Sequence, residues 1–180
     1  MNRYGKDEGI VLAKKNLLNG NRLVILFTKA HGKIVLTGYG VRKLTSRRLS
    51  HLETGNYIRI SFHKKNSYFY LSETELIYAY SKIKKSGEKL SLLFLFLTIL
   101  SKILPENQPE QELFTIAKKV LRKMNNVSDF TLTSLIPYIT LCLQKSGFVN
   151  EEQVKNPSFD PITFIEDLVD KKLILFNLGG

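Results

Sequence analysis

The chain has 180 residues, 43% hydrophobic and 24% charged, a composition that allows a buried core and excludes a disordered chain. Its formal net charge is +11, and the surplus is uneven. Residues 1–80 carry 14 Lys and Arg against 5 Asp and Glu, a balance of +9, whereas residues 81–180 carry 13 against 11. A basic first half is typical of a segment that meets a polyanion, either nucleic acid or an anionic membrane surface.

Five short strands are predicted in the first 80 residues, separated by turns such as Asn19-Gly20. The clearest is 57–63, where Ile58, Ile60 and Phe62 alternate with more polar residues. The predicted strands are 9–14, 22–28, 33–37, 57–63 and 68–77. This number of strands suggests a small barrel, and the OB-fold is the five-stranded barrel that binds oligonucleotides. We count Tyr68, Phe69 and Tyr70 as at least half core by alternation.

A polar hinge at 82–87 separates this region from a helical one, which predicts two domains, 1–80 and 81–180, and the α+β class. Helices are predicted at 88–104, from Pro109 onward, at 129–146 and at 162–172, followed by an apolar tail at 173–178. Pro137 is expected to kink the third helix or to mark a later start. Gly147 is expected to be a left-handed C-cap.

Several kinds of site are not expected. One cysteine, Cys142, and three scattered histidines predict no disulfide, no metal site and no cofactor. The apolar stretch 90–100 is too short for a membrane span, which needs about 20 residues. The N-terminus has no apolar segment of the signal-peptide kind, so we expect a cytoplasmic protein that does not bind membranes. No nucleophile elbow or phosphate-binding loop motif is present, and a non-enzymatic role is expected.

The Gly38-Tyr39-Gly40 turn is followed by four cations, Arg42, Lys43, Arg47 and Arg48. Cations on a segment rich in Ser and Thr are suited to bind a phosphate backbone. The alternative is a solvated loop that keeps the protein soluble.

The first half also carries a pattern of residues that resembles the N-terminal domain of the bacterial RecO recombination-mediator proteins. The segments that carry it are NGNRLVILFT at 19–28, Gly32-Lys33, GYGVRK at 38–43, Ser46 and Leu52-Glu53. The resemblance implies an OB-fold that binds single-stranded DNA, anneals complementary strands and helps to load the recombinase RecA. The implied partners are RecR and the acidic C-terminal tail of single-stranded-DNA-binding protein.

The chain departs from that family in two respects. Many members carry a four-cysteine zinc module after the helix that ends in Gly-Phe, and the corresponding region here has no cysteine. Zinc is therefore not expected. The chain is also short, so the family's C-terminal helices are expected to be curtailed.

The candidate residues fall into two sets. Arg22 and Lys33 match family positions. Tyr39 is expected either to stack on a base or to close the barrel end. Arg59 belongs to an outward-facing set with Tyr57 and His63, and the alternative for this set is that the helical domain covers it. The predicted nucleic-acid contacts are Arg22, Lys33, Tyr39, Arg42, Lys43, Arg47, Arg48 and Arg59. The predicted dock for an acidic peptide consists of Lys118, Lys119, Arg122 and Lys123 on the second helix, which are otherwise a solvated face.

The favoured hypothesis is therefore a DNA repair and recombination mediator that acts by electrostatic screening of two strands. Two alternatives stay open. One is an interaction adaptor for RecR or single-stranded-DNA-binding protein that anneals weakly. The other is an RNA-binding OB-fold protein.

Overall fold

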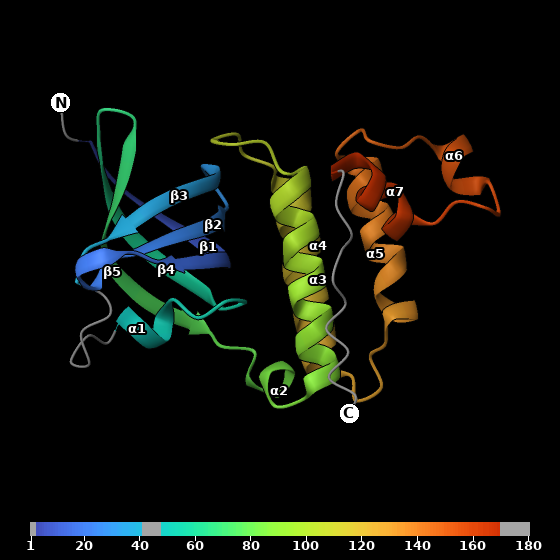
Figure 1. The fold of residues 1–180 in the computed structure, drawn as a ribbon, viewed down its shortest axis with the longest axis horizontal. Helices are drawn as coiled ribbons and strands as arrows, with labels where there is room; N and C mark the ends of the chain where they lie inside the picture. The colour runs from blue at the N-terminus through green and yellow to red at the C-terminus, as the bar shows by residue number, and fades with distance from the viewer. Residues whose placement is uncertain (1–2, 41–47, 170–180) are drawn as a thin grey trace. The chain divides into compact units, whose positions relative to one another are not determined.

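The computed structural model describes residues 3–40 and 48–169 (Figure 1). The chain forms two compact units. The first comprises Met1–Ala79 with Pro105–Gln111, and the second comprises Tyr80–Leu104 with Glu112–Gly180. The first unit is built of strands and the second of helices.

The first unit is a closed five-stranded barrel with the strand order β1-β2-β3-β5-β4. Its strands are β1 (Arg3–Asn16), β2 (Arg22–Thr28), β3 (Gly32–Gly38), β4 (Tyr57–Lys65) and β5 (Tyr68–Tyr78). The barrel followed by helices confirms the predicted α+β class and OB-type barrel. Within the described part of this unit, two short elements were not predicted, the 3-10 helix η1 (Leu18–Gly20) and the helix α1 (Arg48–His51).

The barrel interior follows the alternation in the sequence. Ile58, Ile60 and Phe62 of β4 are buried, and they join one apolar cluster with residues from all the other strands. Each fully buried side chain of this size contributes about 1.5–3 kcal/mol relative to exposure. Strand β1 begins at Arg3 rather than at the predicted Gly9, because its first half pairs with β4 although its sequence is polar.

The turn between β2 and β3 rests on a buried carboxylate. The Asp7 side chain is 4% exposed and lies 2.7 Å from Nδ1 of His31. It accepts hydrogen bonds from the backbone N–H of Ala30, at 3.0 and 3.2 Å, and from that of Glu8 at 2.7 Å. Gly32 follows with φ of +70°, in the left-handed region that favours glycine. Asp7 therefore joins β1 to the turn by bonds to main-chain and side-chain groups.

The second unit contains α2 (Ser81–Lys84), α3 (Gly87–Ile103), α4 (Gln111–Asn126), α5 (Leu132–Lys145), α6 (Glu151–Lys155) and α7 (Pro161–Val169). The predicted polar hinge is partly wrong, because α2 forms there and buries Ile83. Helix α4 begins at Gln111 rather than at Pro109. Helix α5 continues through Pro137, so of the two expected effects of this proline the later start does not occur. No helix in the described ranges 3–40 and 48–169 is both long and apolar enough to cross a bilayer.

Helix α3 is the core of the helical unit, as its apolar sequence predicts, with side chains such as Leu93, Phe96 and Ile99 buried. Helix α5 contributes Cys142, and burial raises the pKa of this thiol to about 12. After α5, Gly147 has φ of +74°, and the N–H of Phe148 donates to the carbonyl of Leu143 at 3.0 Å. These bonds confirm the predicted left-handed cap.

Candidate nucleic-acid interface

The outer face of the barrel carries three rows of residues across β1, β4 and β5, because the registers of the two ladders align them. Residues that point to the same side of neighbouring strands are adjacent in space. The rows are Glu8, Arg59 and Glu75; Lys6, Ser61 and Glu73; and Tyr4, His63 and Tyr70.

The first row is an ion-pair network. Arg59 Nη1 donates to Glu75 at 2.7 Å, and its Nη2 donates to Glu8 at 3.0 Å. The hydrogen bond to Glu8, followed by the bond and charge of Glu75, raises the pKa of Arg59 above its usual value. Arg59 was predicted to contact nucleic acid, and in this structure its charge is shared between two carboxylates of its own sheet.

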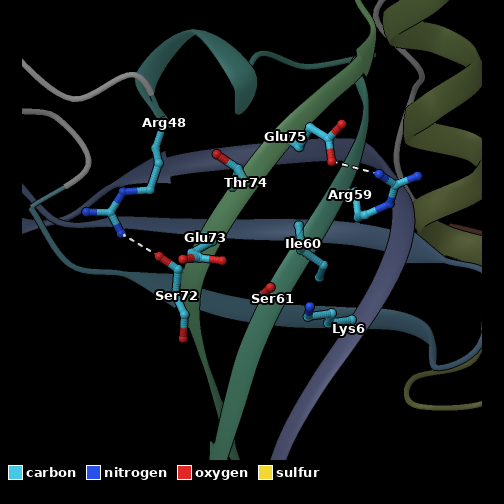
Figure 2. Close-up of a pocket in the computed structure, with 9 residues that line it drawn as sticks. All are labelled: Lys6, Arg48, Arg59, Ile60, Ser61, Ser72, Glu73, Thr74 and Glu75. Carbon is cyan, nitrogen blue, oxygen red and sulfur yellow. Dashed lines mark hydrogen bonds and ion pairs between the residues drawn. The ribbon is translucent and has the colours of Figure 1, made fainter.

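The second row lies in a groove of about 490 Å³ (Figure 2). Small Ser61 lies centrally between the longer residues of β4, Arg59 and His63. The lining residues are Lys6, Arg48, Arg59, Ile60, Ser61, Ser72, Glu73, Thr74 and Glu75. Figure 2 shows Arg48 reaching the Ser72 carbonyl from α1, and Arg59 paired with Glu75. The groove therefore mixes three cations with two carboxylates.

The third row is aromatic and continues beyond β5. His63 and Tyr70 stack with ring centroids 5.1 Å apart, and Tyr70 stacks on Tyr39, which follows β3, at 5.8 Å. Tyr4 adjoins His63 at 5.9 Å with the rings tilted by 46°. The two end members are the exposed ones, with Tyr4 79% and Tyr39 56% exposed. We call these four residues the aromatic row.

Arg48 holds the Tyr39 end of this row. Its Nη2 donates to the carbonyl of Tyr39 and its Nη1 to that of Ser72, each at 3.2 Å. Ser72 is the extra residue of a β-bulge, because Ser61 pairs with Glu73 whereas Phe62 pairs with Leu71. A bulge leaves one residue outside the ladder, and Arg48 uses the carbonyl there. The N–H of Gly40 also donates to Asn21 at 3.0 Å.

Two other predicted contacts are buried, Arg22 almost fully and Lys33 in part. Arg22 is 6% exposed, its Nε donates to Asn16 at 3.1 Å, and its Nη1 lies 3.9 Å from Glu53. Glu53 also pairs with Lys14. Lys33 is half-buried, and its carbonyl accepts from Asn107 at 2.9 Å. Because Arg22 is buried, a phosphate could reach its guanidinium only if the residues around it moved. Its contacts with Asn16 and Glu53 therefore indicate a structural role.

Of the predicted loop cations, Arg48 is described, and Arg42, Lys43 and Arg47 lie outside the described residues. The structure thus brings together two predicted residues, Tyr39 and Arg48, on one edge of the barrel. Their role in binding stays a prediction.

The predicted dock on α4 has three exposed members, Lys119, Arg122 and Lys123, and the first two lie three residues apart on the helix. Lys123 donates to the hydroxyl of Tyr138 at 3.2 Å and lies over its ring. Lys118 is half-buried and lies 5.9 Å from the Phe114 ring centroid. Lys119, Arg122 and Lys123 therefore reach solvent, and Lys118 and Lys123 contact aromatic rings.

Sequence reasoning missed Tyr4 and Tyr70 as interface residues. Tyr70 lies half-buried on the outer face, and Tyr68 is 68% exposed, so only Phe69 of that trio is core. Tyr57 was expected to face outward and is instead 6% exposed, with its hydroxyl bonded to Glu8. The buried positions Phe69 and Leu71 indicate by alternation that Tyr70 faces outward. Only the pairing of β4 with β5 shows that Tyr70 lies beside His63, and only the fold shows that it lies beside Tyr39.

Comparison with known proteins agrees with this architecture. Residues 1–80 match the family described as "Recombination protein O N terminal". "DNA repair protein RecO" of Thermoanaerobacter sp. is 29% identical over 150 residues, covering 82% of this chain and 59% of the relative. The RecO proteins of Caldanaerobacter subterraneus (24% over 150 residues, 82% and 60% covered) and Thermobifida fusca (32% over 78 residues, 43% and 32% covered) are also similar.

The chain spans about 60% of the length of the first two relatives. The family match contains every strand of the barrel, from Arg3 to Tyr78. With its barrel matched throughout and its relatives aligned into the helical unit, the chain is similar to the RecO proteins, and its first 80 residues resemble their N-terminal domain.

Proposed function

We propose that this chain is a non-enzymatic DNA repair and recombination mediator that binds single-stranded DNA and anneals complementary strands. The proposal extends to helping RecA loading together with RecR, as the resemblance to the RecO family implies. Its mechanism is electrostatic, because cations on the barrel screen the repulsion between two phosphate backbones and base pairing supplies the sequence reading.

The observation that carries the proposal is how the barrel uses its acidic residues. Four of the five carboxylates in residues 1–80 are engaged within the barrel: Asp7 with His31, Glu8 and Glu75 with Arg59, and Glu53 with Lys14. Among the described residues of 1–80, the exposed lysines outside these pairs are Lys6, Lys15, Lys29, Lys64 and Lys65. The surplus positive charge therefore stays on the surface, where a polyanion reaches it.

The groove offers a matched test. Lys6→Ala is expected to weaken binding to an oligo-dT strand and to flatten the slope of log affinity against log salt by about 0.7, the value for one phosphate contact. Glu73→Ala, across the same groove, is expected to strengthen binding, because it removes a charge that repels phosphate. Fluorescence anisotropy across a salt series measures both, and a stopped-flow annealing assay measures the rate with complementary strands. Salt-independent binding, or annealing no faster than without protein, would refute the proposal.

A second surface is proposed for the acidic tail of single-stranded-DNA-binding protein. Lys119 and Arg122 are exposed neighbours on α4, and a cationic pair of this kind suits carboxylates at a peptide end. The Lys119→Glu, Arg122→Glu double variant is expected to lose most tail-peptide binding, about tenfold or more, with DNA binding little changed. Titration calorimetry with the tail peptide measures the loss.

The matched control is Lys102→Glu with Lys155→Glu, which changes the net charge equally at other exposed positions of the helical unit. If both double variants lose the peptide to the same extent, only net charge matters and the dock on α4 is wrong.

A further inference from the structure

The aromatic row has the geometry of a stack with one open end. The Tyr39 and Tyr70 rings are nearly parallel, at 11°, and the His63 and Tyr70 rings are within 19°. Such spacings of 5–6 Å between nearly parallel rings are offset stacks. His63 and Tyr70 each have a ring neighbour on both sides, whereas Tyr39 is stacked by Tyr70 on one side among the described residues.

The two ends of the aromatic row differ in how well the end ring aligns with its neighbour. Tyr4 is tilted by 46° from its neighbour, so it does not extend the parallel stack. Tyr39 is aligned with the stack, remains 56% exposed and is held through its own carbonyl by Arg48. An exposed ring that is already fixed loses little conformational freedom when a flat ligand lies on it.

We propose that the outer face of Tyr39 is a base-stacking site for single-stranded DNA, where one base extends the stack of His63, Tyr70 and Tyr39. The inference rests on the proposed function and adds how the strand is held. Stacking on a side-chain ring tolerates any base, which suits a protein that must accept strands of every sequence. The guanidinium of Arg48, 3.2 Å from the Tyr39 carbonyl, places a cation beside the stacked base, near the phosphates that flank it.

The site is tested with two strands of equal phosphate number, oligo-dT and the same length made of abasic units. The protein is expected to prefer oligo-dT. Tyr39→Ala is expected to lower affinity for oligo-dT by about 5- to 150-fold, the range for loss of one stacked base, and to leave affinity for the abasic strand unchanged. Tyr39→Phe keeps the ring and is expected to bind as the unchanged protein does.

Tyr68→Ala is the matched control, since Tyr68 is also exposed and lies on β5, and no described aromatic ring stacks on it. Equal affinity for the two strands, or an equal loss with Tyr39→Ala and Tyr68→Ala, would overturn the stacking site while leaving electrostatic DNA binding intact. If the unchanged protein binds neither strand at low salt, the proposed function fails first. Circular dichroism and urea unfolding confirm that each variant is folded.

Discussion

Gly32→Ala is expected to destabilise the barrel more than an alanine at any other left-handed glycine whose surroundings are described. A Cβ built at Gly32 would lie 1.8 Å from the carbonyl oxygen of Gln108 and 2.9 Å from its nitrogen. These are backbone atoms, so no side-chain rotation relieves the overlap. The left-handed conformation costs a non-glycine residue about 1–2 kcal/mol, and overpacking adds about 1–3 kcal/mol.

Two other glycines separate these contributions. Gly20 and Gly147 have φ of +73° and +74°, and a Cβ at either would meet nothing within 4 Å. Alanine at these positions therefore adds the conformational cost alone. Urea unfolding of the three variants measures the free energy of unfolding, and Gly32→Ala should exceed the other two by the overpacking contribution. Equal losses at the three positions would mean that Pro105–Gln111 does not pack against this turn.

Asp7→Ala is expected to lower the free energy of unfolding by about 2–3 kcal/mol, because it leaves the N–H of Ala30 without its acceptor. The carboxylate is almost fully buried, so water does not readily replace it. His31→Ala removes a 40% exposed hydrogen-bond partner of Asp7 and an edge contact with the Phe62 ring, and is expected to cost about 1 kcal/mol, less than Asp7→Ala.

The same urea titrations measure both losses, and the Asp7→Ala, His31→Ala double variant completes the cycle. If His31→Ala costs as much as Asp7→Ala, the contacts of His31 rather than the hydrogen bonds from the backbone hold the turn. Asp7→Asn should fall between them, since the amide keeps one acceptor oxygen and the volume of the side chain.

The sequence predicted the barrel because its apolar residues alternate along β4 and because turn residues separate the strands. It did not predict the first half of β1, where Arg3, Tyr4 and Lys6 carry no apolar period and the pairing comes from β4. Helix α2 was missed for a related reason, since only Ile83 of its four residues is apolar and buried. Local patterns identify elements whose own side chains fill the core, and tertiary pairing decides the others.

The candidate site was less predictable than the fold. Charge and glycine spacing identified Tyr39 and Arg48 as neighbours in sequence. The same reasoning chose Arg22 and Arg59, whose carboxylate neighbours Glu53, Glu8 and Glu75 are remote in sequence or on other strands. The aromatic row depends on three strand registers at once, and one of them shifts at a bulge. A single-residue slip would have moved Tyr70 into the core.

The barrel is closed between β3 and β5 by a short parallel ladder, which we call the seam. Leu36 and Thr37 pair there with Phe69 and Tyr70, whereas β1 and β4 pair along the whole stretch from Arg3 to Ile10. On the outer face, the stack of Tyr39 on Tyr70 joins the residue that follows β3 to β5, across this seam. A base bound to Tyr39 requires the closed seam. Its binding free energy would therefore add to the free energy that keeps the barrel closed there. Binding of DNA would then make the pairing of β3 with β5 more rigid, without any change in the shape of the barrel.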